Sequence, residues 1–175
     1  MNTTETLLER LINVPDELTC FMSWVLWRAE HRGGKPTKIP YNANNPANNA
    51  RANDGSTWAT FERAVNVFAS ALDTASPFCG IGYMFSKDDP YIGVDFDDCV
   101  VGDAILPDVL HAIERFGGYA EISPSLTGVK LWTRAEILIP EERTGFTRPG
   151  MFGCSRVEVY KHGRYFTVTG REVTR

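Results

Sequence analysis

The sequence has no excess of positive charge. Its 175 residues include 18 Lys and Arg against 22 Asp and Glu, so the formal net charge at pH 7 is −4. A protein with this balance has no general electrostatic attraction for nucleic acid. Any site that binds phosphate groups must therefore be local.

The features that mark zinc, secreted and membrane proteins are also missing. The four cysteines are Cys20, Cys79, Cys99 and Cys154. None forms the close Cys-x-x-Cys pair of zinc sites, which favours reduced thiols. No run of about 18 apolar residues occurs, and the N-terminal segment has no basic start before an apolar stretch. We therefore expect a cytoplasmic protein with no membrane partner.

What is present is the composition of a globular protein with a sizeable core. Hydrophobic residues make up 43% of the chain and charged residues 23%. At this length we expect one domain over residues 1–175, or two tightly fused halves. The halves would be an N-terminal α/β part of roughly residues 1–90 and a strand-rich part of residues 91–175.

Apolar residues recur at helical spacing in three segments and alternate with polar residues in several short ones. Helices are predicted over residues 4–12, 56–68 and 107–116, and strands over residues 21–28, 80–85, 91–96, 119–122, 129–133, 157–160 and 165–169. The turns at residues 86–90 and 161–164 predict two hairpins. Residues 31–56 concentrate Gly, Pro and Asn and predict a long loop. The mixture predicts an α+β fold.

A strand that ends in acids carries the strongest chemical signal. Side chains two residues apart share a face of a strand, so Asp95 and Asp97 point one way while Val94 and Phe96 point into the core. Adjacent carboxylates repel, and a divalent cation such as Mg²⁺ or Mn²⁺ relieves that repulsion. Replacing either Asp by Ala is then expected to leave the metal-free fold intact or slightly firmer. The alternative is a strand end capped by solvated acids.

A third carboxylate alternates with apolar residues later in the chain. Glu158 lies between Val157 and Val159, which places it on the polar face of a strand. An isolated acid there is usually part of the wet face. If this strand lies beside Asp95, the three carboxylates can hold two metal ions about 3.5 to 4 Å apart, as in polymerases and nucleases.

Residues 123–132 form a hydroxyl- and glycine-bearing turn that leads into a strand. Backbone N–H groups and hydroxyls of such a turn can hold phosphate oxygens, and Lys130 adds a cation on the same face as Trp132. The turn is not a Walker P-loop, because the Gly-Lys-Ser/Thr order is absent and a strand follows rather than a helix. A plain turn before an edge strand is equally consistent with the sequence.

The order of these motifs resembles the primase-polymerase domain of the archaeo-eukaryotic primase superfamily, in its bifunctional DNA primase/polymerase N-terminal type. The Asp-x-Asp strand is followed by Ser-Pro-Ser-x-x-Gly, by the strand with Glu158, and by residues 163–170 (GRYFTVTG). The similarity extends to residues 35–41 (KPTKIPY) and to Thr57-Trp58. It therefore covers nearly the whole chain.

The resemblance implies a fold and a setting. The fold would be an archaeo-eukaryotic primase-like core, with a mostly antiparallel sheet flanked by helices and an RRM-like second half. Residues 1–175 would form one catalytic domain of a longer replication protein. A helicase or a small helical priming module, on the same or another chain, is an expected partner.

The resemblance also implies roles for individual residues. Asp95, Asp97 and Glu158 would be the catalytic residues and would bind two Mg²⁺ or Mn²⁺ ions. The residues expected to bind the nucleotide are Ser123, Ser125 and Lys130, with Lys38 and Arg164 as further candidates for phosphate or template contacts.

The second motif departs from the family, because most members end it in His where this chain has Lys130. Lysine cannot act as a neutral imidazole but still pairs with phosphate as a point charge. Phosphoryl transfer depends mainly on positioning and charge neutralisation, so we expect activity to survive the change.

The expected function is template-dependent nucleotidyl transfer. The protein would be a DNA-directed polymerase that extends a DNA primer on a template from dNTPs, with de novo priming and the use of NTPs left open. Two alternatives remain: a catalytically weak nucleotide- or nucleic-acid-binding module of a replication initiator, and a metal-dependent nuclease. Nucleotide binding separates the alternatives, because a nuclease has no use for a turn that holds a triphosphate.

Overall fold

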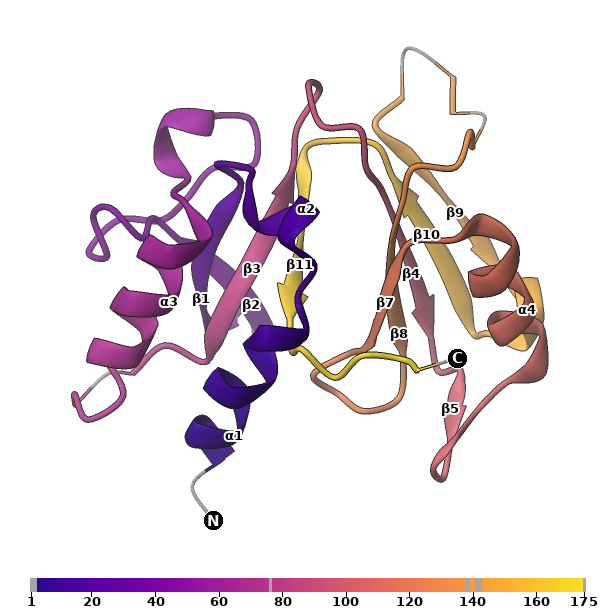
Figure 1. Cartoon of the computed structure of the whole chain (residues 1–175), viewed down its shortest axis with the longest axis horizontal. Helices are drawn as coiled ribbons and strands as arrows, with labels where there is room; N and C mark the ends of the chain where they lie inside the picture. Colours follow the sequence, from indigo (N-terminus) through magenta and orange to yellow (C-terminus); the bar gives the residue numbers. More distant parts are fainter. Residues whose placement is uncertain (1–2, 76, 138, 141–142, 175) are drawn as a thin grey trace. The chain divides into compact units, whose positions relative to one another are not determined.

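The computed structural model describes residues 3–75, 77–137, 139–140 and 143–174. The chain forms two compact units (Figure 1). The first contains residues Met1–Met84 and Tyr165–Gly170, and the second contains Phe85–Arg164 and Arg171–Arg175. The chain therefore passes from one unit to the other three times.

The first unit is built on a four-stranded sheet with the strand order β11-β3-β1-β2. Its strands are β1 (Trp24–Arg32), β2 (Lys35–Tyr41), β3 (Gly80–Phe85) and β11 (Arg164–Val168), and its helices are α1 (Thr3–Arg10), η1 (Leu11–Asn13), α2 (Asp16–Thr19), η2 (Gly55–Thr57) and α3 (Phe61–Ser70). Helix α3 is capped by Thr60, which precedes it and whose side chain accepts a hydrogen bond from the Arg63 backbone N–H. Ala64 and Phe68 are its buried residues.

The second unit is built on a five-stranded antiparallel sheet with the order β7-β8-β4-β10-β9. Its elements are β4 (Ile92–Asp97), β5 (Val100–Val101), β6 (Ala104–Ile105), α4 (Pro107–Phe116), β7 (Tyr119–Ile122), β8 (Val129–Thr133), β9 (Gly145–Pro149), η3 (Met151–Gly153) and β10 (Arg156–Tyr160). Pro107 stands in the first turn of α4, and Gly117 ends the helix with φ +65°.

One face of this sheet packs against α4 and forms the core of the second unit. The alternate residues of three adjacent strands and the apolar stripe of the helix meet there, namely Val94, Phe96, Val129, Leu131, Val157 and Val159 with Val109, Ala112 and Ile113. Because side chains of a strand alternate between the faces, the residues between these apolar positions lie on the opposite face. That opposite face carries the predicted acids.

The α+β class, with mostly antiparallel sheets and few helices, is confirmed, and the helix over residues 107–116 has the predicted bounds. The primase-like core and the RRM-like half stay predictions, as does the single catalytic domain over residues 1–175. None of the helices within the described ranges is long and apolar enough to cross a membrane.

Three local predictions were wrong. Residues 31–56 are not one long loop, because β2 occupies residues 35–41. Its prolines, Pro36 and Pro40, argue against a central strand, but β2 is the edge strand of the sheet, beside β1, where a missing N–H costs little.

The two predicted hairpins are also wrong, although their strands exist. β3 and β4 belong to different sheets, as do β10 and β11. A short polar turn allows the two strands beside it to pair with each other. The hydrophobic pattern of a strand, however, does not determine which other strand it pairs with.

Candidate active site

The register of the five-stranded sheet places three of the predicted site residues, Lys130, Asp95 and Glu158, in one row. In antiparallel pairs, residues directly opposite one another lie on the same face with Cβ atoms about 4.5 to 5.5 Å apart. Across the five strands, from β7 to β9, this row is Glu121, Lys130, Asp95, Glu158 and Thr147. In the neighbouring row, Asp97 lies opposite Arg156.

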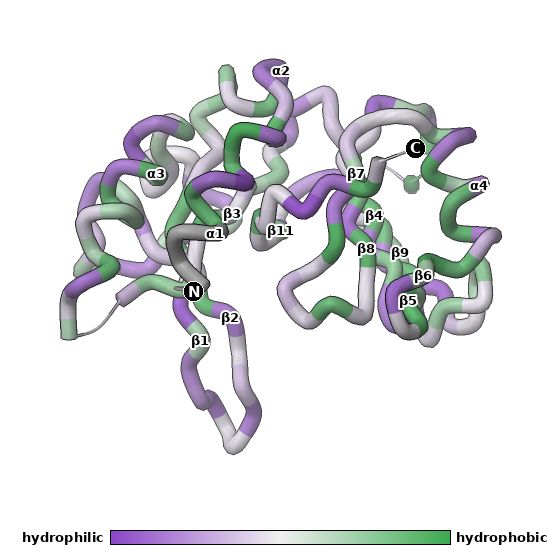
Figure 2. The backbone as a smooth tube through the Cα atoms, turned by 60° about the horizontal axis from the view of Figure 1, so that its bottom comes forward, coloured by the Kyte–Doolittle hydropathy of each residue, from purple (hydrophilic) through white to green (hydrophobic). Residues whose placement is uncertain are grey.

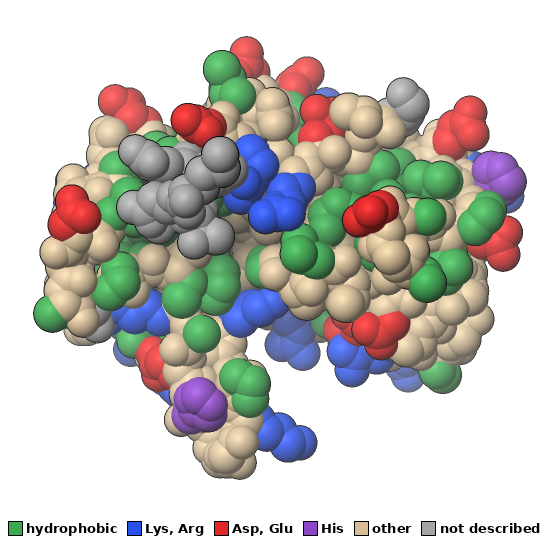
Figure 3. Space-filling view, turned by 90° about the horizontal axis from the view of Figure 1, so that it is seen from below, with side chains coloured by type: hydrophobic (Ala, Val, Ile, Leu, Met, Phe, Trp, Pro, Cys, Tyr) green, Lys and Arg blue, Asp and Glu red, His purple; other side chains and the backbone are tan. Residues whose placement is uncertain are grey.

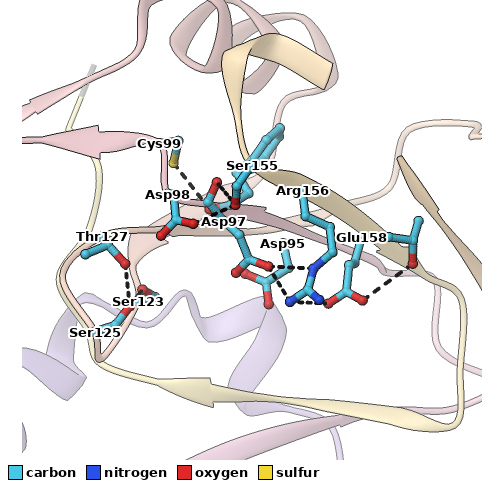
Figure 4. Close-up of polar contacts among 12 residues, drawn as sticks. Asp95, Asp97, Asp98, Cys99, Ser123, Ser125, Thr127, Ser155, Arg156 and Glu158 are labelled. Atoms are coloured by element: carbon cyan, nitrogen blue, oxygen red, sulfur yellow. Dashed lines mark hydrogen bonds and ion pairs between the residues drawn. The ribbon is translucent and has the colours of Figure 1, made fainter. Parts of the chain in front are cut away.

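The structure thus brings together three carboxylates that are distant in sequence. Asp95 and Asp97 come from β4 and Glu158 comes from the adjacent β10, and the three side chains point toward a common area (Figure 4). The close approach follows from the strand pairing. Their roles in catalysis or metal binding stay predictions.

Lys130 is the cation nearest to Asp95. Its Nζ donates a hydrogen bond of 2.5 Å to Asp95 Oδ2, and the two side chains are only 8% and 16% exposed. Burial raises the pKa of Asp95, although the Lys130 ammonium acts in the opposite direction. The charges of Asp97 and Glu158 add to the rise. The ammonium has three N–H donors, and Asp95 Oδ2 accepts a hydrogen bond from one of them.

Arg156 is a second cation among the acids, and the sequence reasoning missed its role. Its guanidinium donates two hydrogen bonds to Asp97 Oδ2, at 2.9 and 2.7 Å, and lies 3.7 Å from Glu158 Oε2 (Figure 4). The hydrogen bonds to Asp97 raise the pKa of Arg156, with the charges of Glu158 and Asp97 adding to the effect. The signal was present in the sequence, because Arg156 and Glu158 both alternate with Val157 and so share a face, but only the register shows that Arg156 faces Asp97.

The hydroxyl-rich turn lies between β7 and β8 and forms a connected chain of hydrogen bonds. Ser123 Oγ lies 2.9 Å from Ser125 Oγ, which lies 3.0 Å from Thr127 Oγ1. Ser123 Oγ also accepts a hydrogen bond from the Gly128 N–H at 3.3 Å. Because β8 lies between β7 and β4, the turn does not precede an edge strand. It leads into the strand that carries Lys130.

The two remaining candidates lie in different units. Arg164, which belongs to the second unit, places its guanidinium 5.7 Å from the ring centre of Tyr160. Burial and a hydrogen bond with Glu158 raise the pKa of Tyr160. Tyr160 therefore contacts both Arg164 and one of the three acids. Lys38 belongs to the first unit, where its ammonium lies 5.9 Å from the Trp27 ring centre.

A buried acid in the same row was also missed. Glu121 has no exposed surface and accepts a hydrogen bond of 3.0 Å from the Tyr119 hydroxyl. Burial and the nearby Glu121 charge raise the pKa of Tyr119. The sequence shows Glu121 only as a polar residue in a short strand, and its place opposite Lys130 follows from the pairing of β7 with β8.

The donor chemistry of the site suits a hard divalent cation, because Asp95, Asp97 and Glu158 offer only carboxylate oxygens. In the part of the chain that the structure describes, however, no group of three or more His, Cys, Asp and Glu side chains is arranged to hold a metal ion. Each of the three acids contacts a cation instead, Lys130 at Asp95 and Arg156 at the other two. Arg156 is 52% exposed, so its side chain has room to move outward.

No known family model matches the chain. The chain is 28% identical over 158 residues to the DNA Primase-polymerase of Nitratiruptor phage NrS-1, and the match covers 87% of this chain and 20% of the phage protein. The chain therefore spans about a fifth of the length of that relative. Its similarity to a protein named for primase and polymerase activity supports the relationship that the order of its motifs predicts.

Proposed function

We propose that this chain adds nucleotides to the 3′ end of a DNA primer on a DNA template. The observation that carries the proposal is the row in which Lys130, Asp95 and Glu158 lie side by side on three adjacent strands, next to a hydroxyl-rich turn. Acids for divalent cations and donors for phosphate thus share one face. The similarity to a phage DNA primase-polymerase supports the same activity.

In this proposal, the turn and Lys130 bind the triphosphate of the incoming nucleotide. Ser123 and Ser125 offer hydroxyl donors, and Lys130 Nζ offers a charge while it keeps its bond to Asp95. The buried position of Lys130 strengthens its attraction to phosphate, because little water screens the charge. These contacts hold the α-phosphate in line for attack.

The carboxylates of Asp95, Asp97 and Glu158 would bind Mg²⁺ or Mn²⁺ in the same site. Two such ions supply charge that lowers the pKa of the 3′ hydroxyl and stabilises the leaving pyrophosphate. The Arg156 guanidinium then has to leave Asp97 and Glu158, which its exposure allows. Until then, Arg156 limits the repulsion between these acids.

The two alternative functions are a nucleotide- or nucleic-acid-binding module and a metal-dependent nuclease. The name of the phage relative favours neither of them. Primer extension separates them from the proposal. A labelled DNA primer on a DNA template is incubated with Mg²⁺ or Mn²⁺ and with each dNTP, and then with each NTP. We expect addition of the nucleotide that is complementary to the template base.

The matched pair of variants is Asp97→Asn and Asp98→Asn. Asp98 follows Asp97 directly, but its carboxylate accepts a hydrogen bond from Ser155 Oγ at 2.6 Å, and asparagine tolerates its φ of +55°. Asp97→Asn should lower extension at least about a hundredfold, and Asp98→Asn should extend nearly as the wild type does. A folded wild-type protein that binds nucleotide but adds none would instead support the binding module.

A further inference from the structure

The first unit carries a two-stranded projection. β1 pairs with β3 only as far as Trp27, but it pairs with β2 as far as Arg32. Residues 28–39 therefore extend past the rest of the sheet as a ribbon, which is closed by Gly33 and Gly34 at φ +57° and +77° (Figure 2). We call these residues the basic ribbon.

Packing does not explain the length of the basic ribbon. Apolar burial ends at Trp27 on one strand and at Ile39 on the other, and residues 31–36 are all exposed. A two-stranded ribbon on its own is marginal in water, because it buries little apolar surface. The ribbon therefore adds little to the core, and its exposed side chains are what it presents to its surroundings.

Charge distinguishes the basic ribbon from the rest of the protein. Residues 28–39 contain four Lys or Arg and one Glu, a net charge of +3. The remaining residues carry −7, since the whole chain carries −4. Lys or Arg and His side chains stand on the projection in the space-filling view (Figure 3). The ribbon is thus a local site of the kind that an acidic protein needs to bind a polyanion.

The base of the basic ribbon is held in place by aromatic contacts. The Arg28 guanidinium lies 4.0 Å from the Phe78 ring centre and 5.0 Å from that of Tyr41. The Tyr41 hydroxyl donates a hydrogen bond to Glu30, which also pairs with Arg32 at 3.3 Å. These contacts neutralise the one acid of the ribbon and fix the direction in which its strands leave the sheet.

The cations of the basic ribbon lie on both of its faces. Arg32 and Lys35 are paired across the strands and so share one face, whereas Lys38 lies opposite Ala29 on the other. We infer that the basic ribbon binds the phosphate backbone of DNA, with Arg32 and Lys35 as direct contacts. That the polyanion is DNA rests on the proposed function.

The test compares two double variants that each remove two positive charges. Arg32→Gln with Lys35→Gln alters the ribbon, and Lys87→Gln with Lys161→Gln alters two exposed turns of the second unit. Binding of a labelled single strand and of a labelled duplex is followed by fluorescence anisotropy from 50 to 200 mM salt. The slope of log K against log salt reports the number of phosphate contacts.

The ribbon variant should weaken binding about tenfold and reduce the slope by about 1.4 on a single strand or about 1.8 on a duplex. A loss on only one of the two DNAs still supports the inference and identifies the form that the ribbon contacts. The turn variant should bind as the wild type does. Equal slopes for the wild type and the ribbon variant, or equal losses in both variants, would overturn the inference.

Failure of the inference and failure of the proposed function give different results. A wild type that extends primers, together with a ribbon variant that keeps the full salt slope, overturns only the role of the ribbon. The opposite result is a wild type that adds no nucleotide, together with a ribbon variant that binds DNA more weakly and with a smaller salt slope than the wild type. That result overturns only the proposed polymerisation.

Discussion

At the scale of single residues, each of the three acids proposed to bind metal is paired with a basic side chain. Lys130 contacts Asp95, and Arg156 contacts both Asp97 and Glu158. The sequence alone predicts that Asp95→Ala leaves the fold intact or slightly more stable. With the ion pair in view, we expect Asp95→Ala to lower the stability, because it leaves the buried Lys130 ammonium without this carboxylate. Breaking a buried pair by removing one partner destabilises a fold.

Lys130→Ala is expected to lower both stability and nucleotide affinity. The loss of stability should reach up to about 3 kcal/mol, because Asp95 keeps a buried charge. Burial already raises the pKa of Asp95, and the loss of the cation raises it further. A raised pKa favours the folded state at low pH, and this contribution is lost as the pH rises through the folded value. The variant should therefore be less impaired at pH 5 than at pH 8, as measured by urea unfolding.

The nucleotide affinity of Lys130→Ala should fall by about 1.5 to 3 kcal/mol, the range for one charge-assisted hydrogen bond. Calorimetry with a non-hydrolysable triphosphate and Mg²⁺ measures this change. Lys130→His should retain part of the affinity below neutral pH and lose it as the imidazole deprotonates. Unchanged affinity in Lys130→Ala would remove Lys130 from the proposed triphosphate site.

At the scale of elements, the closeness of β8 and β4 depends on a glycine. A Cβ atom at Gly128 would lie 2.7 Å from the Phe96 carbonyl oxygen, so no larger residue fits without moving the strands apart. Lys130 lies two residues further along β8. Its contact with Asp95 therefore depends on this close approach.

Gly128→Ala should destabilise the fold by about 1 to 3 kcal/mol, the usual cost of overpacking. Gly55→Ala is the control, because a Cβ there meets only the Trp58 ring at an ordinary 3.7 Å. Thermal unfolding measures the difference, and nucleotide affinity should fall in Gly128→Ala alone. If the two variants unfold at the same temperature, the strand contact at Gly128 does not set the geometry of the site.

Alternation within strands was predictable from the sequence, and strand partners were not. The spacing of Asp95, Asp97 and Glu158 against apolar residues correctly predicts which side chains avoid the core. The register that sets Arg156 opposite Asp97 depends on the packing of the whole sheet, which no local pattern records. The same limit explains why two hairpins were wrongly predicted and why the proline-containing strand β2 was predicted as part of a loop.

At the scale of the whole molecule, neither unit is a continuous piece of chain. β11 returns to the sheet of the first unit, where Phe166 and Val168 are buried. After β11, Thr169 and Gly170 accept hydrogen bonds from Arg10 and Asn13 through their carbonyl oxygens. The first unit is therefore completed by the last part of the sequence.

A fragment of residues 1–84 should lack a cooperative thermal transition, because it loses two buried side chains worth about 1.5 to 3 kcal/mol each and exposes the edge of β3. The same fragment joined to residues 165–170 through a Gly-Ser linker should recover one. Circular dichroism measures both. A fragment 1–84 that melts like the whole chain would show that β11 is dispensable.

The proposal that Asp95, Asp97 and Glu158 form one catalytic centre is tested most directly by a double-mutant cycle. The rate of single-nucleotide addition to a templated primer is measured for the wild type, Asp97→Asn, Glu158→Gln and the double variant, after thermal unfolding shows that all four are folded. If the acids act as one unit, each single variant should lose nearly as much rate as the double variant. Losses that multiply in the double variant, or a single variant that keeps the wild-type rate, would contradict the shared centre.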